Sequence, residues 1–147
     1  MIRTARPDDT PALGAIAEAA GLFPADLLAP MIAPAFADAP DLWMVAEEAG
    51  APVGLAFARP EPMTDRVWNL LALAVAPAAR GAGLAGALIA RIEAASEARM
   101  MIVETTQLPE QAAARALYEG KGYTEEGRVR GFYRVGEDKV IFRKVLQ

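Results

Sequence analysis

The chain has 147 residues, enough for one domain with a hydrophobic core but too few for two ordinary domains. Hydrophobic residues make up 54%, which excludes disorder, and a formal net charge of −4 argues against the clustered basic face that binds nucleic acid. Cysteine and histidine are both absent, which excludes disulfides, thiolate nucleophiles, Cys/His zinc sites and histidine-based triads, so we predict no metal site.

The first third of the chain predicts one strand followed by helices. Residues 2–6 form a short strand that ends at a proline. Apolar residues then recur at helical spacing up to Gly21, and Asp8 or Asp9 can cap this helix. A proline inside a helix costs about 3 kcal/mol. The alanine-rich residues 23–36, which contain prolines, should therefore form two short or kinked helical pieces.

The middle of the chain predicts three strands, a helix and a fourth strand. Residues 42–47 and 52–58 indicate a hairpin around a tight turn. Residues 67–75 are apolar on both faces, so we expect a central strand that is covered on both sides. An apolar stripe predicts a helix over residues 83–98, and residues 100–105 should form the next buried strand.

The last third predicts a helix and a hairpin. Pro109 suits the first turn of a helix that runs to Gly120 or Gly122. Two antiparallel strands should follow, over residues 123–135 and 139–146.

The predicted order of elements is β-α-α-β-β-β-α-β-α-β-β, without repeats or linkers. We therefore expect a single α/β domain over residues 1–147. No signal-like segment opens the chain, and no apolar run approaches the roughly 18 residues of a membrane span. The expected protein is cytoplasmic and has no membrane partner.

Residues 81–86 read GAGLAG, a literal G-x-G-x-x-G between a predicted strand and a predicted helix. Glu104 follows about 20 residues later, where a dinucleotide-binding fold keeps its ribose-binding carboxylate. In that fold the first glycine ends the strand and further β-α-β units follow. Here residues 77–80 intervene, and only a helix and a hairpin follow Glu104. A different phosphate-binding loop and a small-residue helix start that only packs remain as interpretations.

The surroundings of these glycines resemble the GNAT superfamily of N-acetyltransferases. The segment RGAGLA at residues 80–85 fits the superfamily pattern Arg/Gln-x-x-Gly-x-Gly/Ala and follows LAVAP at residues 73–77. The opening at residues 2–9, the segment QAAARALYEGKGY at 111–123 and the closing hairpin at 132–146 match the remaining motifs in order. The resemblance implies a mixed, mostly antiparallel sheet of about seven strands, flanked by four helices, with the fourth and fifth strands splayed.

The resemblance also implies acetyl-CoA as cosubstrate. Small residues let the backbone close on a diphosphate, and the free N–H groups and dipole of a helix start favour its charge. In the superfamily the fourth strand pairs with the pantetheine arm as with an added strand, and Gln111 replaces the usual asparagine beside that arm. The residues expected to contact the cofactor are Leu73, Ala74, Val75, Arg80, Gly81, Ala82, Gly83, Leu84, Ala85, Gly86, Gln111 and Ala114.

Acetyl transfer to an amine needs a neutral amine, a stabilised oxyanion and a proton for the departing thiolate. Tyr118 matches the tyrosine that serves as general acid in the superfamily, and a phenol with a pKa of about 10 is protonated at neutral pH. Gln111, Ala114 and Tyr118 share one helix face at i, i+3 and i+7. The alternative is that Tyr118 only packs beside Leu117.

The general base has more than one candidate. Some branches, including the histone acetyltransferases, use a glutamate on the fourth strand, but Asn69 stands at that place and an amide cannot accept the proton. Asn69 can instead hold a water or a polar group of the substrate, or it can form a hydrogen bond with a backbone group in the core. Glu104 matches the glutamate base of the ribosomal-protein N-terminal acetyltransferases, although its interval to Tyr118 is slightly longer here. Glu104 is thus either catalytic or structural, and a base acting through water is the further option.

The acceptor amine should lie opposite the cofactor. We expect its site between residues 23–36, the loop at 60–65, Trp68 and the final hairpin near Phe132 and Tyr133. The predicted activity is acetyl transfer to a primary amine of a small molecule or peptide, by direct attack in a ternary complex, in a monomer or homodimer. The alternative is a non-catalytic domain that binds acyl-CoA as a sensor.

Overall fold

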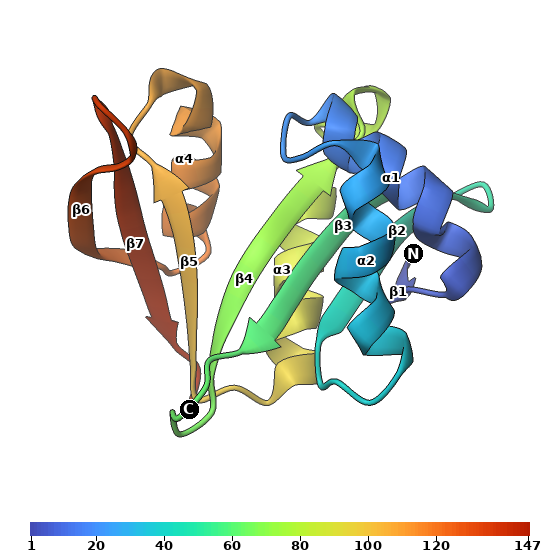
Figure 1. Cartoon of the computed structure of the whole chain (residues 1–147), viewed down its shortest axis with the longest axis horizontal. Coiled ribbons are helices and arrows are strands. Elements are labelled where there is room, and N and C mark those ends of the chain that lie inside the picture. The colour runs from blue at the N-terminus through green and yellow to red at the C-terminus, as the bar shows by residue number, and fades with distance from the viewer.

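One mixed sheet with helices on both faces organises residues 1–147, all of which the computed structural model describes (Figure 1). The order of elements confirms the predicted succession of strands and helices. The elements are β1 (Ile2–Thr4), α1 (Thr10–Ala19), α2 (Leu28–Ile32), β2 (Leu42–Glu48), β3 (Ala51–Pro60), β4 (Val67–Val75), α3 (Leu84–Ser96), β5 (Met100–Thr106), α4 (Ala112–Gly120), β6 (Thr124–Arg134) and β7 (Glu137–Val145). None of the helices combines the length and apolar character needed to cross a lipid bilayer.

The strands lie in the order β1-β2-β3-β4-β5-β7-β6, and only β4 and β5 run parallel to each other. These two strands pair only from Val67 opposite Met100 to Leu70 opposite Val103. Beyond that point they diverge, as Figure 1 shows. The predicted fold class, a mostly antiparallel seven-stranded sheet with four helices and splayed fourth and fifth strands, is confirmed.

Two hydrophobic clusters fill the two faces of the sheet. α1 and α2 pack on one face of β2, β3 and β4, whereas α3 and α4 pack on the other face. β4 contributes to both clusters. Its Ala72 and Ala74 lie in the cluster under α1 and α2, and its Leu70 and Val75 lie in the cluster under α3 and α4. This double burial is the physical reason for the continuous apolar run of β4.

The predicted coverage of β4 on both faces is wrong at Leu71, which is 44% exposed. The register with β3 steps from Phe57 opposite Ala72 to Ala58 opposite Leu70, so Leu71 is an extra residue in a β-bulge. It also follows directly after the last residue of β4 that pairs with β5. Leu71 therefore has a strand partner on neither side.

The half of the sheet formed by β5, β7 and β6 is tied to α3 by polar contacts. Lys144 of β7 pairs with Glu93 of α3 at 3.0 Å, and the buried Tyr123 donates its hydroxyl to the same carboxylate at 2.7 Å. Alternate residues of β5 and β7 pack beside α3 and α4, but none belongs to the cluster under α1 and α2. The other face of this half-sheet is therefore only partly covered.

The segment between α1 and β2 forms short helical pieces, as predicted. α2 lies between two 3₁₀ turns, Ala25–Leu27 and Ala33–Phe36. The final turn is tighter than predicted, because Glu137 already pairs with Arg134 across the hairpin and leaves a two-residue connection. Gly136 adopts φ 83° there, a conformation that favours glycine.

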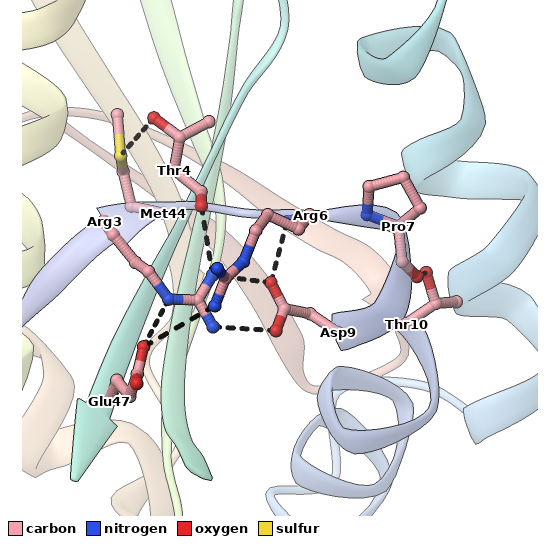
Figure 2. A network of polar contacts seen from close by, with 8 residues as sticks. All are labelled: Arg3, Thr4, Arg6, Pro7, Asp9, Thr10, Met44 and Glu47. Carbon is pink, nitrogen blue, oxygen red and sulfur yellow. Dashed lines mark hydrogen bonds and ion pairs between the residues drawn. The ribbon is translucent and has the colours of Figure 1, made fainter. Parts of the chain in front are cut away.

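Asp9 holds the N-terminal strand to the rest of the sheet, which corrects its predicted role as a helix cap. Its carboxylate makes no capping bond to α1. It accepts the backbone N–H of Arg6 at 2.7 Å and two guanidinium bonds from Arg3 at 2.7 and 2.8 Å (Figure 2). Arg3 also contacts Glu47 at the end of β2 (Figure 2). The bond to Arg3 holds the pKa of the Asp9 carboxyl below its usual range.

Asp9→Asn should lower the free energy of unfolding by about 1.5–3 kcal/mol at pH 7, because it removes charged hydrogen bonds from a buried group. The folded-state pKa is lowered, so this contribution is present above about pH 4, the ordinary pKa of aspartate. It should disappear as the pH falls through the lower folded-state value. Urea unfolding across pH 3–7 measures the difference. The exposed Asp8→Asn is the matched control, and an equal loss in both variants would contradict the assignment.

Candidate active site

A cavity of about 770 Å³ lies where β4 and β5 part. Residues 70–75 of β4 and 103–106 of β5 line its two sides, α4 contributes a third wall, and Tyr133 of β6 reaches it from the hairpin. Past Leu70, the edge of β4 that faces β5 has no strand partner. Its backbone groups are therefore free to pair with an extended ligand.

The glycine segment forms the loop between β4 and α3. β4 ends at Val75, and a 3₁₀ turn, Pro77–Ala79, separates it from Gly81 and Gly83. This interval confirms that the first glycine does not end the strand as in a dinucleotide-binding fold. Gly81 and Gly83 adopt φ 88° and 77°, and a β-carbon at either would meet no atom within 4 Å. Glycine is therefore required at these two positions by the backbone conformation, because a side chain would not clash with any neighbouring atom.

The start of α3 presents free backbone donors. Its first intrahelical bond runs from the N–H of Ala87 to the carbonyl of Gly83. The N–H groups of Leu84, Ala85 and Gly86 consequently have no intrahelical acceptor. Arg80 donates its Nε to the carbonyl of Val75 at 3.1 Å, which closes the loop onto the end of β4. Such an arrangement favours an anion.

Lys121 explains the third glycine of the segment. A β-carbon on Gly86 would lie 2.5 Å from Cε and 2.8 Å from Nζ of Lys121. The lysine side chain therefore lies across the first turn of α3, in space that only glycine leaves open. Lys139 and Lys144, the other lysines of the chain, pair with carboxylates, whereas Lys121 has no such partner. It adds an unpaired positive charge beside the free N–H groups.

The predicted helix face of α4 points into the cavity. Gln111, Ala114 and Tyr118 all line it. Tyr118 is 7% exposed, packs near the rings of Tyr123 and Phe142, and makes no hydrogen bond to another protein group. Burial raises the pKa of Tyr118 to about 12. The phenol is therefore protonated throughout the physiological range and has its hydroxyl free for a ligand.

Glu104 lies on the cavity wall opposite α4, just beyond the last β4–β5 pair. Its carboxylate pairs with Lys139 at 2.6 Å and accepts an N–H from Asn69 at 3.0 Å. Burial raises the pKa of Glu104, but Lys139 and Asn69 lower it by more, so the pKa is below the usual value for glutamate. The Glu104 carboxylate is therefore ionised at neutral pH, and Asn69, which stands where some branches have a fourth-strand glutamate, donates a hydrogen bond to it.

Of the segments expected around the acceptor amine, the hairpin lines the cavity through Tyr133, whereas residues 23–36, the loop at 60–65 and Trp68 do not line it. Trp68 is buried in the cluster beside α3 and α4, because residues alternate along β4 and Asn69 occupies the opposite face. Tyr133 lines the cavity, and Phe132 lies under Lys139, with 3.7 Å from Nζ to its ring centroid. In the loop, Glu61 accepts a second N–H from Asn69 at 2.9 Å.

The structure thus gathers most of the predicted site residues around one cavity. Those that line it are Leu73, Ala74, Val75, Arg80, Ala85, Glu104, Gln111, Ala114 and Tyr118. The remaining members of the glycine segment, Gly81, Ala82, Gly83, Leu84 and Gly86, form the loop and helix start but do not line the cavity. The sequence does not point to Lys121, Lys139 or Glu61, because their neighbours in the structure come from distant parts of the chain. The only local sign of these three residues in the sequence is that each is a polar residue next to a glycine, a proline or an apolar residue.

Comparison with known proteins places this arrangement in a family. The family model described as the acetyltransferase (GNAT) domain matches residues 39–125. A protein from Desulfovibrio desulfuricans assigned to the GNAT family has 26% identity and a TM-score of 0.92, over 100% of this chain and 99% of that chain. Ribosomal-protein-alanine N-acetyltransferase from Brucella melitensis has 27% identity and a TM-score of 0.82, over 99% of each chain.

A third solved structure is similar in fold. The yncA protein from Salmonella typhimurium, solved with its cofactor acetyl-CoA, has 21% identity and a TM-score of 0.81. The similarity covers 100% of this chain and 94% of that chain. No match was found among curated protein sequences.

Proposed function

The chain belongs to the GNAT family of acetyltransferases, which use acetyl-CoA, and on this premise we propose that it acetylates a primary amine by direct attack in a ternary complex. The acceptor is a small molecule or a peptide. The observation that carries this proposal is the cavity between β4 and β5, which has a loop with free N–H groups at its edge and both a protonated phenol and an ionised carboxylate in its lining.

The cofactor half of the proposal rests on groups that the fold leaves unpaired. The diphosphate fits the free N–H groups at the start of α3, together with the positive charges of Arg80 and Lys121. The pantetheine arm fits the unpaired edge of β4 between Leu71 and Val75, with Gln111 and Ala114 on the opposite wall. The yncA protein, whose fold is similar, carries acetyl-CoA as its cofactor.

The chemical half of the proposal assigns a role to each end of the cavity. The amine nitrogen attacks the thioester carbonyl carbon, the carbon–sulfur bond breaks, and the thiolate takes a proton from the Tyr118 hydroxyl. Backbone groups near Leu71, which have no strand partner, are available to stabilise the oxyanion. The attacking amine loses a proton as the new bond forms, and Glu104 is an ionised carboxylate in the cavity lining.

Glu104 is better suited to act through a water than by itself. Its pKa is below the usual value, so it is a weak base, but it is fully ionised and can orient a water that accepts the proton. Asn69 and Lys139 fix the carboxylate in place. The glutamate and the water therefore act together as the base, which combines the two options that the sequence leaves open.

Acetyl-CoA should stabilise the protein in a thermal-shift experiment, and NAD should not. A ligand at 100 times its Kd adds about 2.7 kcal/mol to the free energy of unfolding, which raises the Tm by several degrees for a domain of this size.

Lys121→Met keeps the aliphatic stem and removes the charge, so we expect acetyl-CoA to bind about tenfold more weakly. Gly86→Ala should have a similar effect by displacing the lysine.

The control for these variants is Arg91→Gln, which removes an exposed charge from α3, the helix that carries Gly86. Stabilisation by NAD alone would overturn the assignment of the loop. Wild-type affinity in both Lys121→Met and Gly86→Ala would show that the lysine does not face the phosphates.

Tyr118→Phe should lower kcat by about 10²–10⁴-fold with nearly unchanged acetyl-CoA affinity, if the phenol protonates the thiolate. The ring is retained and the hydroxyl has no protein partner, so stability should change little. Thiol release from acetyl-CoA, followed with a panel of amines, measures the rate. Wild-type turnover in the variant would refute the acid assignment. Tight cofactor binding without turnover of any amine by the wild-type protein would favour the sensor function.

Glu104→Gln should lower kcat by about 10²-fold if the carboxylate holds the proton-accepting water. Because the pKa of Glu104 is lowered, the wild-type group is charged across the whole range from pH 6 to 9. Any rate increase with pH in that range should therefore reflect deprotonation of the amine and persist in the variant. Glu110→Gln, which also lines the cavity, is the matched control. A rate close to wild type in Glu104→Gln would assign the residue a purely structural role.

A further inference from the structure

Three neighbouring strands bring a row of polar residues to one face of the sheet. Glu61 directly follows β3, Asn69 lies in β4, and Glu104 lies in β5. The amide nitrogen of Asn69 donates to a carboxylate oxygen of Glu61 at 2.9 Å and to one of Glu104 at 3.0 Å. Since both oxygens contact the same nitrogen, they are no more than about 6 Å apart.

The charges along this row are not balanced. Lys139 neutralises Glu104 and is itself held over the ring of Phe132. Glu61 is half-buried, yet no arginine or lysine pairs with it, and its only side-chain partner is the amide of Asn69. A carboxylate in this position has no cation in the protein and can bind one that a ligand supplies.

The row also lacks hydrogen-bond donors. Asn69 is only 4% exposed, and its Oδ1 has no donor within hydrogen-bond distance. The carboxamide lies between the two carboxylates, and both of these acceptor groups share its single amide nitrogen. An alkylammonium group carries three N–H donors and one positive charge, and it would correct both deficits together.

This row continues into the cavity of the candidate active site. Glu104 and Tyr133 line that cavity together with Tyr118, whereas Glu61 lies on the far side of Asn69. A molecule that extends from the acetyl-transfer end along the open face of the sheet therefore reaches Glu104 first and Glu61 second.

We propose that Glu61 binds a second, positively charged nitrogen of the acceptor, so that the acceptor is a short diamine or polyamine whose reacting nitrogen lies at Glu104. The proposal rests on the proposed acetyltransferase function. The ammonium of Lys139 beside Glu104 disfavours another cation there, which suits a nitrogen that must be neutral to react. Glu61 has no such neighbour and suits the nitrogen that stays charged. The spacing of the two carboxylates matches amines separated by a few carbons.

Calorimetry on the protein saturated with CoA tests this without requiring turnover. The probes are 1,3-diaminopropane, 3-amino-1-propanol, which has one amine and a hydroxyl in place of the second, and β-alanine, which has a carboxylate there. We expect the diamine to bind at least tenfold more tightly than the amino alcohol, and β-alanine to bind most weakly. The same order should hold for kcat/KM with acetyl-CoA.

Glu61→Gln keeps the shape of the side chain and removes its charge. It should bring the diamine and the amino alcohol to within about twofold of each other and leave the amino alcohol unchanged. Glu48→Gln, an exposed carboxylate without an ion pair at the end of β2, is the control and should keep the wild-type ratio. An unaltered acetyl-CoA thermal shift in Glu61→Gln would show that the variant is folded.

The outcomes separate this proposal from the proposed function. Equal affinity for diamine and amino alcohol in the wild type, or a preference that survives Glu61→Gln, overturns the assignment of Glu61. Tighter binding of a peptide amino terminus than of the diamine overturns the acceptor class. If the protein binds neither CoA nor acetyl-CoA, the acetyltransferase function itself fails and this proposal fails with it.

Discussion

The short parallel pairing of β4 with β5 is the constraint on which the rest of the structure depends. The strands share hydrogen bonds over residues 67–70 and 100–103 and then separate. The separation leaves the edge of β4 that faces β5 unpaired beyond Leu70, opens a cavity between the two strands and exposes the bulge at Leu71. Most of the predicted cofactor contacts and both candidate catalytic groups line this opening.

The two halves of the sheet must nevertheless be held in fixed relation, since the cavity walls come from both. α3 provides the link. It packs on β2, β3 and β4, and its Glu93 binds Lys144 and Tyr123 of the other half. The same helix begins at the glycine loop, so the element that joins the halves also presents the free N–H groups. A single helix thus sets the distance between the glycine loop and the far wall.

The environments of the two candidate catalytic groups shift their pKa values in opposite directions. Burial among aromatic rings raises the pKa of Tyr118 and keeps it a proton donor. Lys139 and Asn69 outweigh burial at Glu104 and keep it ionised. This separation suits a reaction in which one wall supplies a proton and the other receives one. Glu61, next to Asn69 but without a cation, adds an unpaired negative charge to the same face of the sheet.

The order of strands and helices, the glycine loop and the α4 face with Tyr118 could be predicted from the sequence, because each depends on periodicity or on residues close together in the chain. The paired environment of Glu104, the position of Lys121 over Gly86 and the link from Asn69 to Glu61 could not. Each joins residues that only strand register or helix packing brings together. Trp68 and Leu71 were misjudged for the same reason. Local hydrophobicity indicates that a residue lies in a strand, but the bulge and the splay decide which face it occupies and what covers it.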